Sequence, residues 1–308
     1  MNLRFIVASL LPAIALAGAP ADRDGFLPAE ARLASLAKLP AAPAGAPVRT
    51  AVRLGASGCP MVLYRGRLVT LAEQPGAAMA DWTPPADTEP VRDFCWLDDR
   101  TLVLLRARGL DFIRDGKPER AVALPARGMR VARADAAHCY LFGGKAAPGN
   151  RDVLLFGMDG SLRNLFQAPE AVTAVAGDGR ATFVAAGLVV YVVAPGARPR
   201  AVFSERTAIT QLAYAPPVGV FYVTADGVGC MDAPGSGVVF LRGEFASLDS
   251  RGGRLLLLTR DREVLLIAPI AGFPRVIRGV RRVAAEERAA GGTASPGEVE
   301  SETDEPGS

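Results

Sequence analysis

The sequence predicts an all-β protein, and three observations support this fold class. Short apolar runs such as LVLL (102–105), LVVYVV (188–193) and LLLL (255–258) recur along the chain, each too short for a stable helix. Corners of Gly, Pro, Asp or Arg-Gly separate the runs by only a few residues, which suits antiparallel hairpins rather than parallel crossovers. The runs are continuous, so both faces of each strand should be covered. Stacked blades of a β-propeller provide such an arrangement without helices, and a β-solenoid is the alternative.

Six repeats are visible, with a spacing of roughly 36 to 42 residues that is typical of propeller blades. They begin near Thr50, Val91, Met129, Ala171, Ala208 and Glu244. We therefore expect six four-stranded antiparallel blades; a seventh remains open if residues 22–49 hold a degenerate repeat. The dipeptides Asp115-Gly116, Asp159-Gly160 and Asp226-Gly227 are expected to form hairpin turns.

The two ends of the chain lie outside the repeats. Residues 1–19 combine Arg4, an apolar run and small residues before Gly18 and Pro20, which is typical of a cleaved signal peptide; an uncleaved anchor is the alternative. The Ala/Pro-rich segment 20–49 contains ARLASLAKLP (31–40), which resembles the outer strands of the repeats, so we expect it to pair with the last blade and close the ring. The propeller is assigned to residues 50–283, and the acidic tail 284–308 is expected to be disordered.

Over about residues 50–280 the repeats resemble the WD-repeat, NHL and YVTN-type β-propeller superfamily. The likeness is architectural, because no repeat carries the paired GH and WD dipeptides of true WD repeats and no SxDxGxTW box of sialidases is present. The resemblance therefore implies a fold and assigns no functional residue.

Catalytic and metal-binding patterns are scarce. The chain has no GxSxG, HExxH, P-loop or Rossmann pattern. His138 is the only histidine, and although Asp135 could orient it, we expect a structural or solvent-exposed role. Calcium-dependent propeller hydrolases hold their metal with Glu, Asn and Asp in the central channel, whereas this chain has asparagine only at Asn2, Asn150 and Asn164. A lactonase-type site, a metal and a cofactor are therefore not expected.

The four cysteines allow zero, one or two disulfides in an oxidising compartment. Cys59 lies near the first turn of repeat one and Cys95 lies late in the first strand of repeat two, so neighbouring blades could bring them together. Cys95 with Cys139 is the alternative by the same argument. Cys230 is expected to be a buried thiol.

Basic side chains gather at the corner between the second and third strands of four repeats. They are Arg65 and Arg67, Arg106 and Arg108, Lys145 and Arg151, and Arg260 and Arg262. Equivalent corners of a propeller meet on one face, so these residues could form a docking surface; ordinary solvated arginine is the alternative. The net charge of +3 gives no reason to expect nucleic acid.

These observations predict an exported protein of the bacterial periplasm, with no membrane segment after signal cleavage. We expect a non-enzymatic binding or scaffold module that recognises a protein partner through its loops. The alternatives are a propeller hydrolase or lyase with a site in the central channel, and a sensor of a small ligand.

Overall fold

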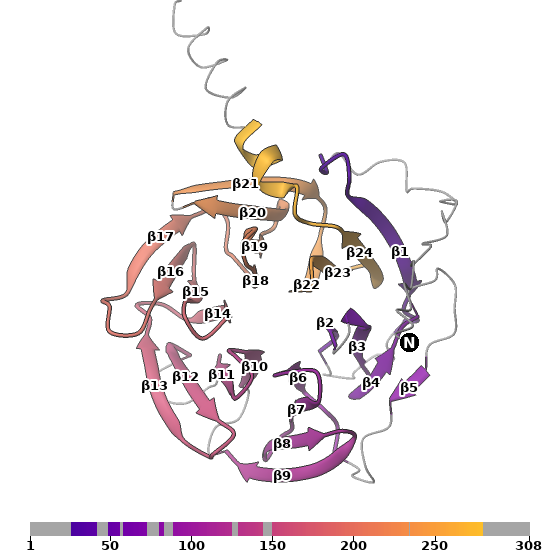
Figure 1. Cartoon of the computed structure of the whole chain (residues 1–308), viewed down its shortest axis with the longest axis vertical. Coiled ribbons are helices and arrows are strands. Elements are labelled where there is room, and N and C mark those ends of the chain that lie inside the picture. Colours follow the sequence, from indigo (N-terminus) through magenta and orange to yellow (C-terminus); the bar gives the residue numbers. More distant parts are fainter. Residues whose placement is uncertain are drawn as a thin grey trace, which may run out of the picture.

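A computed structural model describes residues 26–41, 49–55, 58–72, 80–82, 89–124, 129–143, 150–233 and 235–279. These residues form six four-stranded antiparallel sheets arranged radially around a central axis (Figure 1). The prediction of a six-bladed β-propeller is confirmed. The described part of segment 22–49 contributes one strand rather than a seventh blade.

Each blade runs outward from an inner strand that borders the channel. Blade 1 consists of β2 (Ala51–Leu54), β3 (Pro60–Tyr64), β4 (Arg67–Thr70) and β5 (Ala80–Trp82). Blade 2 consists of β6 (Asp93–Trp96), β7 (Thr101–Leu105), β8 (Gly109–Arg114) and β9 (Lys117–Ala123). Blade 3 consists of β10 (Arg130–Arg133), β11 (His138–Phe142), β12 (Asp152–Gly157) and β13 (Leu162–Gln167).

The remaining blades follow the same order. Blade 4 consists of β14 (Val172–Gly177), β15 (Thr182–Ala186), β16 (Val189–Val193) and β17 (Arg200–Ser204). Blade 5 consists of β18 (Gln211–Ala215), β19 (Gly219–Val223), β20 (Gly227–Ala233) and β21 (Ser236–Arg242). Blade 6 consists of β22 (Phe245–Arg251), β23 (Arg254–Thr259), β24 (Glu263–Ala268) and, from the other end of the chain, β1 (Arg32–Lys38).

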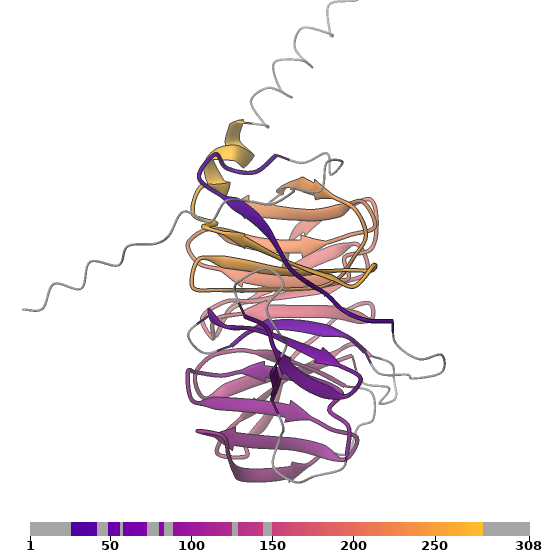
Figure 2. The ribbon, with the colours of Figure 1, turned by 90° about the vertical axis from the view of Figure 1, so that its right-hand side faces the viewer.

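The ring is closed by β1, which forms from the segment where a closing strand is expected. It pairs antiparallel with β24 from Arg32 opposite Ala268 to Lys38 opposite Glu263, and lies across the outer face in Figure 2. Leu36 of this strand is buried in a cluster with residues of blades 1 and 6. Blade 6 therefore joins both ends of the propeller.

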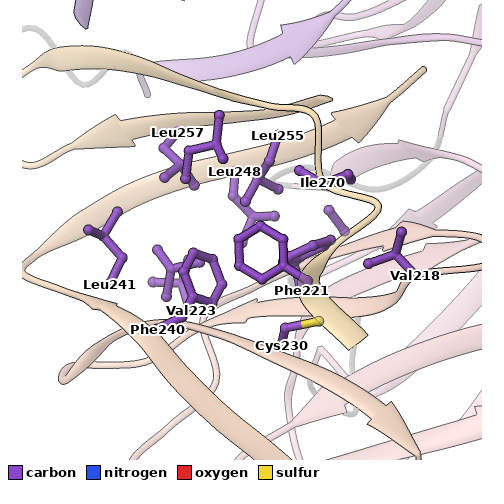
Figure 3. Close-up of a cluster of buried hydrophobic side chains, with 14 of the residues drawn as sticks. Val218, Phe221, Val223, Cys230, Phe240, Leu241, Leu248, Leu255, Leu257 and Ile270 are labelled. Carbon is purple, nitrogen blue, oxygen red and sulfur yellow. The ribbon is translucent and has the colours of Figure 1, made fainter. Parts of the chain in front are cut away.

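Hydrophobic clusters fill the spaces between neighbouring blades. Between blades 5 and 6, Phe221 and Phe240 pack with Leu255 and Leu257 (Figure 3). A short helix at residues 273–279 covers this cluster, and the Phe273 ring meets the Phe240 ring with centroids 4.5 Å apart. The strands are apolar on both sides because each sheet packs against two neighbours, which explains the continuous apolar runs.

Hydrogen bonds between blades fix the inner strands. The Leu54 N–H of β2 donates to Asp249 Oδ2 of β22 at 2.7 Å. The hydroxyl of Thr173 donates to the Ile209 carbonyl at 2.6 Å, and that of Ser250 donates to the Tyr214 carbonyl at 3.0 Å. Such bonds hold the backbone that carries the channel side chains.

Several sequence predictions concern other parts of the chain. The predicted signal peptide (1–19) and acidic tail (284–308) lie outside the described residues. Within those that are described, no helix has the length and hydropathy of a membrane span. The Asp115-Gly116 turn forms with positive φ at both residues (51° and 75°), the conformation of a type I′ hairpin.

Candidate functional site

Three arginines surround one carboxylate where the inner strands begin. Asp93, the first residue of β6, is only 1% exposed. The Arg53 Nη2 atom lies 3.3 Å from Asp93 Oδ1, and the Arg49 Nη1 atom lies 3.5 Å from Asp93 Oδ2. The Nε atom of Arg130, the first residue of β10, lies 4.0 Å from Asp93 Oδ2. We call Arg49, Arg53, Asp93 and Arg130 the arginine ring.

The arginine ring has more positive than negative charge. Burial alone would raise the pKa of Asp93, but Arg53, Arg49 and Arg130 outweigh burial and hold that pKa below its usual value. Burial, with repulsion from Arg49 and Arg53, lowers the pKa of Arg130 to about 9. Asp93 is therefore a fixed anion that leaves two of the three guanidinium charges uncompensated within the ring.

Other guanidinium N–H groups of the arginine ring donate to neutral oxygens. Gln211 Oε1, at the start of β18, accepts from Arg130 Nη2 at 2.9 Å and from Arg49 Nη2 at 3.4 Å. Arg130 Nη1 donates to the Thr173 carbonyl, and its guanidinium lies over the Phe142 ring, 5.0 Å from the centroid. Arg130 Nε is buried without a hydrogen-bond acceptor among the described residues. The ring therefore still has capacity for an acceptor.

Beyond the ring, a cavity of about 70 Å³ continues along the channel toward the ends of the inner strands. Small side chains such as Cys95, Ala132 and Ala213 leave this space. Arg53 and Arg130 line one end. The described residues that line it include one carboxylate, Asp249 of β22. The volume is enough for a few water molecules or a small polar group.

Asp249 is in a different electrostatic environment from Asp93. Protein surrounds its carboxyl, but part of its surface remains accessible, because it lines the cavity. Burial raises the pKa of Asp249, although Arg53 and the backbone N–H groups of Leu54 and Ser250 oppose the rise. A carboxyl with a raised pKa beside a cavity is typical of a proton-transfer group.

Further side chains form the mouth of this cavity. Arg133, Arg251 and Tyr214 line it at the ends of their strands. The Arg251 Nη2 atom lies 2.7 Å from Asp99 Oδ1 at the protein surface. Basic groups therefore stand at both ends of the cavity.

On the opposite face, beyond the ring, lies an open pocket of about 540 Å³. Its lining includes Arg49, Arg130 and Gln211, which lie at or near the starts of inner strands and which we call its floor, and Arg260 and Arg262 of the β23–β24 corner, which we call its wall. We call it the upper pocket.

The arginines of the predicted basic corners lie in different environments. Arg260 and Arg262 line the upper pocket, whereas Arg106 is buried and paired with Asp111 and the Glu89 carbonyl. Arg65 donates to the Ala41 carbonyl at 2.7 Å and lies over the Tyr64 ring.

Arg67, Arg108 and Arg151 are exposed, and Lys145 lies outside the described residues. The docking surface as a whole stays an untested prediction.

The cysteines appear as thiols in the structure. Cys59 contacts the carbonyls of Pro60 and Leu71, at sulfur–oxygen distances of 3.9 and 3.8 Å. Cys95 lies instead in a buried cluster with Cys139, so the packing favours the alternative pair. Both disulfide pairings remain predictions. Burial raises the pKa of Cys139 to about 12, which makes it a poorly reactive thiol.

His138 and Asp135 form a pair at the edge of blade 3. The His138 Nδ1 atom lies 2.9 Å from Asp135 Oδ1, and both side chains are about one-third exposed. His138 lies on β11, the second strand of its blade, and it does not line the channel cavity.

The sequence analysis missed the channel residues Arg49, Arg53, Asp93, Arg130, Gln211 and Asp249. A signal was present, because polar residues interrupt the apolar first strand in VRDF (91–94), MRVAR (129–133) and SLDS (247–250). In a strand covered on both faces, such residues must face the channel.

The channel does not suit a divalent cation. Among the residues of the six inner strands, the carboxylates are Asp93 and Asp249, and three guanidinium groups crowd Asp93. The described residues contain no group of three or more His, Cys, Asp or Glu side chains able to hold a metal. Calcium and magnesium prefer several oxygen ligands with compensating negative charge.

Comparison with protein-family models and with curated proteins finds no match. Solved structures do resemble the chain. A gluconolactonase from Xanthomonas campestris has a TM-score of 0.59 at 15% identity, with 84% of this chain and 98% of that chain covered. Virginiamycin B lyase from Staphylococcus aureus has a TM-score of 0.52 at 8% identity, covering 70% and 78%.

A calcium-binding protein, regucalcin, from Agrobacterium tumefaciens has a TM-score of 0.56 at 10% identity, covering 72% and 90%. At these identities the likeness shows the fold alone. The described channel residues do not reproduce a cation site, so calcium binding is not carried over to this chain.

The prediction of a non-enzymatic scaffold module is corrected by these comparisons. Structures that resemble the chain include a lyase and a gluconolactonase, so the fold occurs in enzymes, and none of these findings supports a scaffold role. The fold itself was predicted correctly, and the likeness to β-propellers is confirmed at the level of the fold.

Proposed function

We propose that this protein is an enzyme of the hydrolase or lyase class, with its site in the channel cavity. The observation that carries the proposal is Asp249, a carboxyl with a raised pKa that faces the cavity of about 70 Å³, which Arg53 and Arg130 also line. A base beside groups that stabilise developing negative charge is the minimum equipment for hydrolysis or elimination.

In hydrolysis, the Asp249 carboxylate takes a proton from a water molecule as that water attacks a substrate carbonyl. A carbon–oxygen bond forms, and the charge that develops on the carbonyl oxygen is stabilised by a guanidinium group. The bond to the leaving oxygen then breaks, and Asp249 returns the proton to that oxygen. In elimination, the same carboxylate instead takes a proton from the substrate carbon next to a carbonyl. The electrons of that C–H bond form a carbon–carbon double bond as the bond from the adjacent carbon to the leaving oxygen breaks, and Asp249 returns the proton to that oxygen.

The substrate is expected to be small, and to be an anion or to become one. Arg53 and Arg130 at one end of the cavity and Arg133 and Arg251 at the other favour negative charge. The name of the gluconolactonase of the same fold makes lactones the first substrates to test, because ring opening yields a carboxylate.

The test measures acid release from a panel of sugar lactones with a pH indicator, and elimination by ultraviolet absorbance. The wild type should turn over at least one substrate, with activity rising through the raised pKa of Asp249. Asp249→Asn should lower kcat by about 100-fold or more, as expected for loss of a general base.

The stability of Asp249→Asn separates catalysis from structure. An asparagine oxygen can still accept the Leu54 N–H bond. The pKa of Asp249 is higher in the folded state than in the unfolded state. Ionisation of Asp249 therefore lowers the free energy of unfolding as pH rises from the unfolded-state pKa through the folded-state pKa. The variant should therefore be at least as stable as the wild type near neutral pH.

Asp159→Asn, on the exposed corner of blade 3, is the matched control and should keep full activity. The proposal is overturned if no substrate of the panel reacts, or if Asp249→Asn reacts as fast as the wild type.

A further inference from the structure

The upper pocket has a surplus of positive charge that the protein does not neutralise. Four of its lining residues are arginines, namely Arg49, Arg130, Arg260 and Arg262. No carboxylate lines the pocket among the described residues. Asp93 pairs with Arg49 and Arg130 of the pocket, but it also pairs with Arg53, so its charge is divided among three guanidinium groups. Glu244 pairs with Arg260 at 3.3 Å, where both side chains are about two-thirds exposed. Such an exposed pair is weak and can be replaced by a ligand.

The floor of the pocket is prepared for an acceptor. Arg49 and Arg130 both donate to the single oxygen of Gln211, and Arg130 Nε is buried without an acceptor in the described part of the chain. An anion seated here would accept from the guanidinium forks in the paired geometry that oxyanions favour. Its charge would also oppose the burial and the repulsion from Arg49 and Arg53 that together lower the pKa of Arg130.

The wall of the pocket adds two cations to those of the floor. Arg262 lies at the corner between β23 and β24, where its φ is 67°, and its guanidinium belongs to none of the ion pairs found within the described residues. Thr50 and Thr259 also line the pocket and add hydroxyl donors. The volume of about 540 Å³ lies in the range of small-molecule sites.

We propose that the upper pocket binds a small oxyanion with two negative charges, of the phosphate type, at a site separate from the Asp249 cavity. The four arginines that line the pocket, set against Asp93 and Glu244, leave a surplus of two positive charges. A dianion would neutralise that surplus, and a monoanion only half of it. The inference does not depend on the reaction proposed for Asp249.

The test is isothermal titration of the whole protein at low ionic strength with inorganic phosphate, succinate and acetate. Phosphate should bind at one site per chain, and its affinity should exceed that of acetate by about tenfold or more. Succinate carries two carboxylates, so its affinity shows whether the pocket recognises a phosphate-type anion or any dianion. Phosphate should also raise the midpoint of thermal unfolding, since a ligand that binds only the folded state stabilises it. Binding should weaken as salt is added.

The double variant Arg260→Gln/Arg262→Gln should weaken phosphate binding by about tenfold while the protein stays folded, because both side chains lie on the wall. Arg163→Gln/Arg242→Gln, on exposed positions of the outer strands β13 and β21, is the matched control and should bind as the wild type. Asp249→Asn should also bind phosphate normally, which keeps this test independent of the proposed reaction.

Absence of phosphate binding, equal binding of acetate, or equal loss in the control double variant would overturn the proposal. Tighter binding of succinate than phosphate would overturn the phosphate-type assignment.

Discussion

Asp93→Asn tests the central interaction of the channel. The substitution keeps the shape of the side chain and one oxygen, which can accept either the Phe94 N–H now bound to Oδ1 or the Val131 N–H now bound to Oδ2. It removes the negative charge that lies 3.3 to 4.0 Å from three guanidinium groups. The variant therefore removes the charge and one backbone hydrogen bond while the volume of the side chain stays the same.

The expected loss of stability follows from burial and distance. At an effective dielectric constant of about 20, two unit charges 4 Å apart attract by roughly 4 kcal/mol, so three pairs give a gross attraction of about 12 kcal/mol. Most of this offsets the cost of taking the charges out of water. Removing one partner of a buried pair typically costs about 3–5 kcal/mol, because the other charges stay buried without compensation. We expect a loss in this range.

Urea unfolding followed by circular dichroism measures this loss as a lower midpoint at an unchanged slope. The double variant Asp93→Asn/Arg53→Gln should recover part of the stability, with a coupling energy of about 1–3 kcal/mol, because it removes one of the unpaired cations. If Asp93→Asn unfolds within about 1 kcal/mol of the wild type, the arginine ring does not depend on its carboxylate and the electrostatic argument fails.

Two further predictions concern the fold. Leu256→Asp or Val190→Asp, at positions that are 0% and 1% exposed, should each lower the free energy of unfolding by several kcal/mol in the same urea assay, because the new charge has no partner; unchanged stability would contradict the strand assignment. Leu36→Asp in the closing strand β1 should lower the midpoint of thermal unfolding and make the chain near β1 easier to cleave by a protease. Ser35→Asp, whose side chain is less buried, should have a small effect. Equal effects of the two substitutions would mean that β1 contributes little to closure of the ring.

The fold could be predicted because its signal is repeated. Both faces of each blade are covered by neighbouring blades, so the same continuous apolar pattern returns six times. A repeat with a weak pattern can therefore be identified from its spacing to the others. The closing strand was expected because ARLASLAKLP (31–40) resembles outer strands such as RAVALPARG (120–128). The count of blades followed from the spacing of the repeats.

The channel could not be predicted from the sequence because its residues are scattered. Arg53, Asp93 and Arg130 are separated by about forty residues each and become neighbours only because inner strands of successive blades face one axis. Each alone looks like a polar residue at a strand end. At the corners, Arg106 has the position that the spacing predicts, but its side chain turns inward to Asp111.

The two carboxylates of the inner strands show how position decides their roles. Asp93 touches three guanidinium groups, and its pKa is lowered; its contribution to stability is present above the unfolded value of about 3.9 and is lost as pH falls through the folded value. Asp249 faces a cavity, and burial raises its pKa, so its ionisation opposes folding as pH rises.

The arginine ring therefore keeps a fixed anion, whereas the cavity keeps a carboxyl that can exchange its proton. Environments that move two buried carboxyls in opposite directions are the usual sign that one supports the structure and the other takes part in proton transfer. The same arginines that hold Asp93 form the floor of the upper pocket, so the ring divides the channel into a compartment suited to an anion and a compartment suited to proton transfer.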